Sequence, residues 1–429
     1  MTLALARPAW PMALASCSEP VVFPGAAVNA VILPYRYTGP DRFNPLSQTG
    51  EQLSGLLHLE VLFSMLKYGS VGATQLMGEP GGCELTTVTE KVLGIRSADW
   101  EIQPGRGVVF LWGKLYEEGS DIYVQSYARF LRRDAREEVQ LTIDGAAGSG
   151  FQFIAHLPLE NIAFAPRRLS RNDLEHIQTE FQRSVVIRPS PDLSQSGEPL
   201  PIHGEAAAYW VTDVRGEWMH IASQFDEVRG WVRARPDPAD WPLRQKLPEL
   251  AYLDGVAGFL RYQASQEANG VSPSPDRTIE SISRAFQVYE EAAQERHAPE
   301  AAATWRAILG FMHLVTAVQE PERREAAREA EFLLREAVQL VPYNGDLRNL
   351  AFLASFYLSS SRPPSPDGDR LITELLDALA VDPENEDVLT NLEQLYAYMI
   401  TQPARAPFST AEIQRRLDAV QQVKVRMRE

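Results

Sequence analysis

The sequence predicts three consecutive domains of different classes: an α/β domain over residues 21–166, a small β-barrel over 184–236, and an all-helical array over 248–429. Three observations support this fold class. Strand-like and helix-like apolar patterns alternate in the first zone, short strand-like runs fill the second, and helical periodicity continues through the third. A chain of 429 residues also exceeds what one hydrophobic core usually serves.

The first zone is predicted to fold as a strand, a helix and a hairpin. Residues 29–37 form an apolar run that ends at a Thr-Gly-Pro turn. The stretch from Leu53 to Leu66 has apolar residues spaced by three and four, which is typical of an amphipathic helix. Two further strands, 107–113 and 121–130, are joined by turn residues and form a predicted hairpin. A linker helix over 167–183 is expected to end this part of the chain.

These patterns resemble the α/β domain found at the N-terminus of TolB and in FlgO-like and CsgG-like envelope proteins. The resemblance rests on the helix and on three strand segments: Val31-Ile32-Leu33-Pro34-Tyr35, Trp112-Gly113-Lys114-Leu115-Tyr116 and Ile122-Tyr123-Val124-Gln125. It covers about a third of the chain. The resemblance implies a role in assembly or recognition rather than in catalysis.

The second zone has the pattern of a small barrel. Its strand-like runs at 185–191, 209–212, 217–221 and 230–233 are short and are separated by turns rich in Gly, Pro and Asp. The pattern resembles a bacterial Src-homology-3-like domain, in which a tryptophan strand follows a turn and Gly-Trp-Val closes the module. That resemblance implies a peptide-binding aromatic face, with four candidates: Tyr209, Trp210, Trp218 and Trp231. Because strand tryptophans of so small a domain more commonly form its core, the core interpretation is preferred.

The third zone contains two similar helical fingerprints. The residues of the two copies are Ala330, Leu334, Ala337 and Pro342, and Leu371, Leu375, Ala378 and Pro383. Each copy is similar to the second helix of a tetratricopeptide repeat, in which small residues permit close packing and a proline ends the helix. The second copy departs from the family at Leu371, which is not small. The resemblance implies stacked helical hairpins whose surface binds other proteins.

Breaker residues divide the third zone into eight predicted helices, which pair as four hairpins. The predicted helices span 248–265, 278–296, 299–318, 321–340, 345–360, 369–381, 385–401 and 409–427. In the first helices of two hairpins, Ala351 and Glu393 stand where the family has glycine.

The formal net charge of the chain is −16. The deficit lies mainly in residues 248–429, which carry 28 Asp and Glu against 18 Lys and Arg. Because an acidic surface repels phosphate backbones, nucleic acid is not expected as a partner. The preferred interpretation is a solvated helical surface, and the alternative is a dedicated site for a basic ligand.

Two cysteines, Cys17 and Cys83, are too few for a disulfide framework and lie in no metal-ligand spacing. The residues before the first, Leu14-Ala15-Ser16, fit the lipobox of bacterial lipoproteins and make Cys17 a candidate lipidation site. The preceding segment is a poor signal peptide because prolines interrupt its apolar stretch. Residues 1–20 are therefore expected to be an uncleaved tail or, alternatively, a lipoprotein signal.

The location of the protein follows from this choice. No later segment has ~18 or more uninterrupted apolar residues, so membrane contact is expected only through lipidation. A cytoplasmic location is expected, and a lipid-anchored periplasmic location is the alternative.

The search for chemistry yields no catalytic, cofactor-binding or metal-binding candidates. The seven histidines are scattered without metal-ligand spacing, and the glycine clusters lack the Lys-Ser/Thr ending of a phosphate loop. The sequence therefore favours a non-catalytic adaptor that binds protein partners through the helical array and recruits or regulates an effector through its N-terminal domains. The alternatives are an envelope lipoprotein acylated at Cys17 and an enzyme whose site forms between domains. The oligomeric state stays open.

Overall fold

The computed structural model describes residues 17–23, 25–39, 44–64, 71–76, 83–94, 107–131, 136–144, 150–158, 161–181, 185–199, 208–223, 228–233, 247–268, 274–293, 298–360 and 367–428. The chain divides into two compact units. The first, called the sheet unit, comprises Met1–Leu131 and Pro166–Arg261. The second, called the helical unit, comprises Arg132–Ala165 and Tyr262–Glu429.

The sheet unit is built on one mixed β-sheet. Its described strands are β1 (Val28–Ile32), β2 (Arg36–Tyr37), β3 (Val71–Gln75), β4 (Gly107–Glu118), β5 (Asp121–Leu131), β9 (Arg167–Leu169), β10 (Val186–Arg188), β11 (Glu198–Pro199), β12 (Ala208–Arg215), β13 (Trp218–Ser223) and β14 (Arg229–Arg233). Its helices are α1 (Pro45–Ser64), α2 (Leu85–Gly94), α3 (Arg171–Phe181) and most of α5 (Glu249–Ala268). The strand order is β11-β10-β14-β13-β12-β3-β1-β4-β5, and β2 and β9 pair with β4 and β5.

The centre of this sheet is an α/β core. Strand β1 lies between β3 and β4 and runs parallel to both, so helical crossovers are required: α1 links β1 to β3, and α2 links β3 to β4. The two crossovers run in opposite directions across the sheet, and right-handed connections then place α1 and α2 on opposite faces. On the α2 face, Val88 and Val92 share a buried cluster with Val31 and Phe110. The predicted strand, helix and hairpin are confirmed as β1, α1 and the β4–β5 pair, whereas β3 and α2, which lie between α1 and β4 in the chain, were not predicted.

The predicted hairpin is formed by β4 and β5. The two strands pair from Val108 with Leu131 to Glu118 with Asp121. Gly119 occupies the turn at φ +65°, a left-handed conformation that other residues seldom adopt. The turn residues of the sequence therefore fixed both the existence and the register of this hairpin.

The second zone does not form a separate barrel among the described residues. Its strands pair in the order β11-β10-β14-β13-β12, and β12 then pairs antiparallel with β3 of the α/β core, Tyr209 opposite Ala73. The prediction of the individual strands is confirmed for β10, β12, β13 and β14. Their assignment to an independent module is corrected, because the edge of the α/β sheet accepts β12 as its next strand.

The helical unit begins, among the described residues, with a hairpin and continues with seven α-helices. Its described elements are β6 (Arg136–Asp144), β7 (Gly150–Pro158), β8 (Ile162–Ala163), α6 (Pro275–Ala293), α7 (Pro299–Gln319), α8 (Arg324–Leu340), α9 (Gly345–Ser360), α10 (Gly368–Val381), α11 (Glu386–Thr401), the short 3₁₀ helix η2 (Pro403–Arg405) and α12 (Thr410–Arg428). From α6 to α12, each helix packs on the next along the chain. The predicted helices are confirmed, except that most of α5 belongs to the sheet unit.

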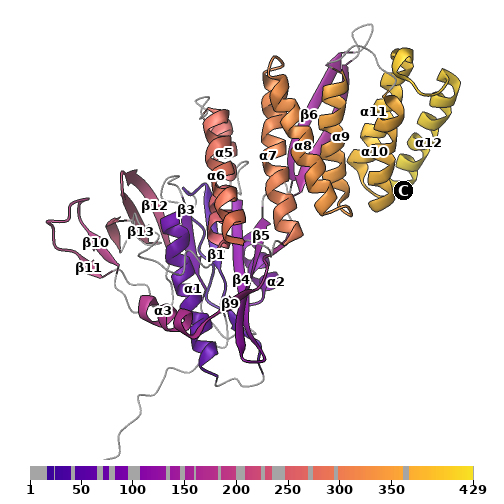
Figure 1. Ribbon diagram of the computed structural model, residues 1–429. Helices are drawn as coiled ribbons and strands as arrows, with labels where there is room; N and C mark the ends of the chain where they lie inside the picture. The colour runs from indigo at the N-terminus through magenta and orange to yellow at the C-terminus, as the bar shows by residue number, and fades with distance from the viewer. Residues whose placement is uncertain are drawn as a thin grey trace, which may run out of the picture. The chain divides into compact units, whose positions relative to one another are not determined.

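Residues 132–165 correct the predicted boundary of the α/β domain. The sequence places them in a continuous domain over 21–166, whereas the structure places them in the helical unit. Strands β6 and β7 form an antiparallel hairpin from Arg136 opposite Pro158 to Asp144 opposite Gly150. This hairpin, called the docked hairpin below, lies against α7, α9 and α11, and in Figure 1 the violet β6 stands among these orange and yellow helices.

One buried titratable group in the sheet unit is His58 on α1. Its side chain is 0% exposed, and its Nε2 lies 2.7 Å from the carbonyl oxygen of Ala73 on β3. Burial lowers the pKa of His58 from 6.5 to about 4, because an apolar environment disfavours the charged ring. The folded protein therefore holds this ring neutral through the mildly acidic range.

We expect His58 to make the sheet unit less stable in mild acid. The unfolded chain binds a proton below pH 6.5, whereas the folded chain binds it only near pH 4, so stability is lost as pH falls between these values. The loss attributable to His58 is about 3 kcal/mol at the acid end. Urea unfolding at several pH values measures it, with His58→Gln as the comparison. Parallel pH curves for the two proteins would contradict this assignment.

Candidate protein-binding face

The two sequence fingerprints lie at helix contacts in the helical unit. Ala330, Leu334 and Ala337 are 0% exposed on α8. On α10, Leu375 and Ala378 are 0% exposed and Leu371 is 3% exposed. Pro342 and Pro383 lie just beyond the ends of these helices, in the turns. The fingerprint residues within the two helices therefore form helix-packing contacts and are not available to a ligand, whereas the two prolines are exposed.

A glycine missed in the sequence explains how closely α7 and α8 approach. A Cβ atom added at Gly310 on α7 would lie 2.7 Å from Cγ of Leu334 and 3.4 Å from the carbonyl oxygen of Ala330. A larger residue would thus force the two helices apart. The helix pair α7 and α8 therefore has the small-residue contact that the fingerprint implies. In the two later pairs, α9 with α10 and α11 with α12, the family's glycine is replaced by Ala351 and Glu393.

Helices α9 and α11 present aromatic rings to the docked hairpin. The ring of Phe153 on β7 lies 4.3 Å from that of Phe356 and 6.2 Å from that of Phe352, centroid to centroid. Phe151 meets Tyr398 of α11 edge-on at 5.6 Å. Alternate β7 residues are buried at 0–7% exposure: Phe151, Phe153, Ala155 and Leu157. One side of the strand is thus fully packed on the helices.

Two buried asparagines bind the backbone of β7 at a single residue. The peptide N–H of Ile154 donates to Oδ1 of Asn391 at 2.8 Å, and the Nδ2 of Asn391 donates back to the Ile154 carbonyl oxygen. The Nδ2 of Asn349 on α9 donates to the same carbonyl oxygen at 3.0 Å, and its Oδ1 accepts from Asn391 at 2.7 Å. Both asparagines are 0% exposed. They form the hydrogen bonds that the N–H and carbonyl groups on the outer edge of β7 would otherwise make with a third strand.

These asparagines make the face specific for an extended chain. A buried amide without a partner costs about 1–3 kcal/mol, so the pair is tolerated because a strand supplies both a donor and an acceptor. Neither interaction involves a side chain of the strand. The recognition at this point is therefore of backbone conformation, and the aromatic contacts add the side-chain preference.

A histidine–aspartate pair closes one end of the face. Nδ1 of His156 on β7 lies 2.6 Å from Oδ2 of Asp387 in the first turn of α11. The two side chains are 15% and 21% exposed, so the pair lies at the rim. Asp387 and Asn391 are four residues apart and share one side of α11.

The sequence contains a signal for this face that the fingerprints do not include. Asn349-Leu350-x2-Leu353-x2-Phe356 on α9 is repeated as Asn391-Leu392-x2-Leu395-x2-Tyr398 on α11, at a spacing of 42 residues. The first and last positions of each copy, seven residues apart, contact the docked hairpin or line its site. A search for repeated polar residues within the first helices would have found the pair.

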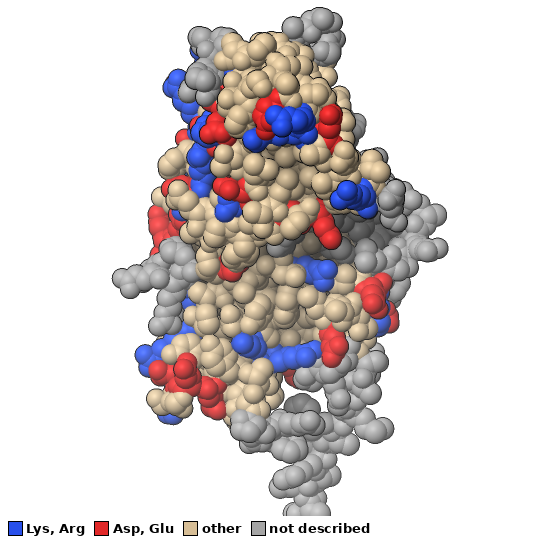
Figure 2. Space-filling model, turned by 90° about the vertical axis from the view of Figure 1, so that its right-hand side faces the viewer, with Lys and Arg blue, Asp and Glu red and all other residues tan. Residues whose placement is uncertain are grey.

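Part of the charge on the helical unit is paired. Arg335 and Arg370 both contact Glu374, at 2.7 Å and 2.9 Å, and Lys424 contacts Glu393 at 2.6 Å. On the face of the molecule drawn in Figure 2, acidic and basic side chains are interspersed. The acidic surplus therefore does not mark a site by itself, which agrees with the preferred interpretation of a solvated surface.

The four aromatic candidates of the second zone do not build one exposed face. Tyr209 and Trp210 are consecutive on β12 and point to opposite sides: Tyr209 stacks near His58 of α1, and Trp210 stacks on Phe23. Trp218 and Trp231 are 8% and 7% exposed. Arginine groups lie over both rings, Arg188 over Trp218 at 5.8 Å and Arg215 over Trp231 at 4.8 Å. The burial of Tyr209, Trp218 and Trp231 agrees with the core interpretation.

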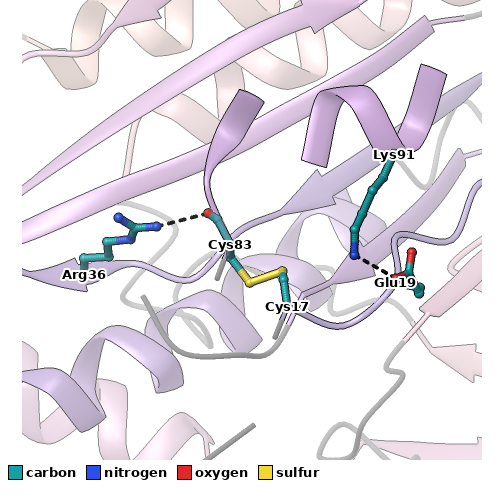
Figure 3. Close-up of a disulfide and its surroundings, with 5 residues drawn as sticks. All are labelled: Cys17, Glu19, Arg36, Cys83 and Lys91. Carbon is teal, nitrogen blue, oxygen red and sulfur yellow. Dashed lines mark hydrogen bonds and ion pairs between the residues drawn. A yellow bond between two sulfur atoms is a disulfide. The ribbon is translucent and has the colours of Figure 1, made fainter. Parts of the chain in front are cut away.

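Cys17 and Cys83 form a disulfide in the sheet unit. Their Cα atoms are 4.9 Å apart, and both side chains belong to the buried cluster under α2. Figure 3 shows the neighbouring contacts: Arg36 donates to the Cys83 carbonyl oxygen at 3.1 Å, and Lys91 of α2 pairs with Glu19 at 2.7 Å. A sulfur in a disulfide cannot also carry a lipid thioether. The lipidation considered for Cys17 as an alternative therefore does not apply to the form of the chain seen here.

The described residues offer little support for other kinds of site. No three His, Cys, Asp or Glu side chains gather as a metal site would require within the described ranges. Helix α7 alone among the described helices has the length and apolar composition to cross a membrane, but 67% of its apolar window is buried in the unit. A core helix has the same properties.

No protein-family model, curated protein or solved structure matches this chain. The functional argument therefore rests on the residues that bind the docked hairpin.

Proposed function

We propose that this chain is a non-catalytic adaptor that binds protein partners through its helical unit, a tetratricopeptide-like array. The observation that supports the proposal most strongly is the pair Asn349 and Asn391, which bind both backbone polar groups of one residue, Ile154. Such contacts suit a protein ligand in extended conformation, because every residue except proline offers the same two groups. The sheet unit would then recruit or regulate an effector.

The site of effector binding is also a proposal. The Src-homology-3-like pattern of the second zone favours recognition of a peptide by β10 to β14. In these strands, the guanidinium group of Arg188 lies over the ring of Trp218, and that of Arg215 lies over the ring of Trp231. An arginine displaced from its ring would expose an aromatic surface beside a positive charge.

The disulfide favours a periplasmic location over a cytoplasmic one. Disulfides persist in secreted and periplasmic proteins and are rare in the reducing cytosol. Cys17 and Cys83 are buried and bonded to each other, which supports an oxidising compartment over a cytoplasmic location. An envelope role is thus kept as the second candidate, without acylation of Cys17.

Residue-specific photo-cross-linking tests the adaptor proposal. A photo-reactive phenylalanine analogue replaces Tyr343, which is 62% exposed in the turn between α8 and α9. The matched control carries the analogue at Leu193, which is 58% exposed in the sheet unit. In extracts of the native cell, we expect the first protein to capture a partner that the second does not.

Capture of the same partner at Leu193 alone would contradict binding through the helical unit. A second probe position in the helical unit is Phe332 on α8, which is 55% exposed. If no partner is captured at Tyr343 or at Phe332, that result also counts against the proposal.

A further inference from the structure

The docked hairpin is unusual in its position along the chain. It follows β5 and precedes β9, which are strands of the sheet unit, yet it packs in the helical unit. Ile154 of the hairpin binds Asn349, which follows it by 195 positions in the sequence, and Asn391, which follows it by 237 positions. A segment supplied from so far away in sequence occupies the face as an extended ligand would.

The contacts define what this face accepts. It takes a strand whose alternate side chains are apolar, with an aromatic ring at the position of Phe153, against Phe352 and Phe356. The backbone N–H and carbonyl of the next residue are bound by asparagines. Three residues after the ring, a hydrogen-bonding or basic side chain meets Asp387. On the paired strand β6, Val139 and Leu141 are also buried, at 4% and 3% exposure.

We infer that the docked hairpin is a built-in occupant of the partner-binding face, and that the partner carries an extended segment of the same chemistry. This inference rests on the proposed function and specifies its ligand: a β-strand with alternate apolar side chains, one of them aromatic, and a basic residue at the position of His156. The hairpin and the partner segment compete for Asn349, Asn391 and the aromatic rings. Binding therefore requires the hairpin to leave.

Proline at position 154 separates the two occupants. Ile154 gives its N–H and its carbonyl to the asparagines, so both groups point away from β6 and its pair with Gln140 is of the non-hydrogen-bonded kind. A proline there removes the donor to Asn391 without breaking a hydrogen bond of the hairpin ladder. Gln152 has the same outward orientation and is exposed, with no bond to the helices among the described residues, which makes Gln152→Pro the matched control.

The probe is a labelled synthetic peptide with the sequence of residues 136–158, and its binding to the full chain is measured by fluorescence anisotropy. We expect Ile154→Pro to bind the peptide about ten-fold or more tightly than the wild type, and Gln152→Pro to behave as the wild type. Adding Asn349→Ala and Asn391→Ala to Ile154→Pro should reverse the gain. His156→Ala, which leaves the backbone unchanged, should give a smaller increase.

Hydrogen exchange of the Ile154→Pro protein completes the test. Exchange is expected to rise in residues 136–158 while α7, α9 and α11 keep their protection. Loss of protection in those helices would show that the hairpin is an integral part of the helical core, and the inference would fall. Equal peptide binding by wild type and Ile154→Pro would also overturn it, whereas the adaptor proposal would still stand or fall on capture at Tyr343.

Discussion

Replacing Phe153 with alanine is expected to lower the free energy of unfolding of the helical unit by about 3–5 kcal/mol. The ring is 0% exposed and packs against Phe356 at 4.3 Å and Phe352 at 6.2 Å, centroid to centroid. Its removal leaves a cavity bounded by two aromatic rings of α9, which cannot close without moving that helix. Urea unfolding of the full chain followed by far-ultraviolet circular dichroism measures the loss, because the helical unit supplies most of the helical signal.

The matched control for this experiment is Phe332→Ala. Phe332 lies on α8 and is 55% exposed, so its removal is expected to change stability by no more than about 0.5 kcal/mol. If Phe153→Ala costs no more than this control, the Phe153 ring contributes no more to the stability of the helical unit than an exposed side chain does. If instead hydrogen exchange rises only in residues 136–158, the substitution has destabilised the docking of the hairpin and not the fold of the helices.

Local sequence patterns predicted most of the elements. The predicted helix 345–360 is α9 residue for residue, and 299–318 differs from α7 by one residue at its end. Breakers such as Pro299 and Pro342 account for this accuracy, since proline ends or begins a helix regardless of tertiary structure. The turn at Gly119 fixed the β4–β5 hairpin in the same local way.

Long-range pairings were beyond the reach of those patterns. The antiparallel pairing of β12 with β3 joins Tyr209 to Ala73, and no local signal distinguishes such an edge from a barrel of its own. The docked hairpin was missed for the same reason, because its apolar side is completed by helices that follow about 200 residues later. Of the candidate face, sequence reasoning found the helices but not Asn349 and Asn391, since in the first helices it compared only the apolar, aromatic and glycine positions of the repeat family.

The disulfide illustrates a third kind of limit. Two cysteines 66 residues apart give no indication of whether their sulfur atoms meet. Here the meeting depends on the fold: Cys17 precedes β1 and Cys83 precedes α2, and both are brought to the α2 side of the sheet. The lipobox pattern before Cys17 suggested a different use of the same sulfur.

Removing the disulfide is expected to destabilise the sheet unit by about 4 kcal/mol, as loop entropy predicts for a closed loop of 66 residues. The variant Cys17→Ser/Cys83→Ser avoids leaving a reactive thiol. Urea unfolding followed by tryptophan fluorescence measures the change, because the sheet unit contributes Trp112, Trp210, Trp218 and Trp231. Reduction of the wild type should give the same loss, while the helical unit, followed by circular dichroism, should keep its unfolding midpoint.

The control for reduction is the double variant itself, whose unfolding should not respond to a reductant. An unchanged midpoint for the reduced wild type would contradict the expected stabilisation.

Intact-mass analysis of protein from the native cell then decides between the two uses of Cys17. A mass two hydrogens below that of the reduced chain indicates the disulfide and an oxidising compartment, a lipid mass on Cys17 indicates the anchored form, and two free thiols favour the cytoplasm.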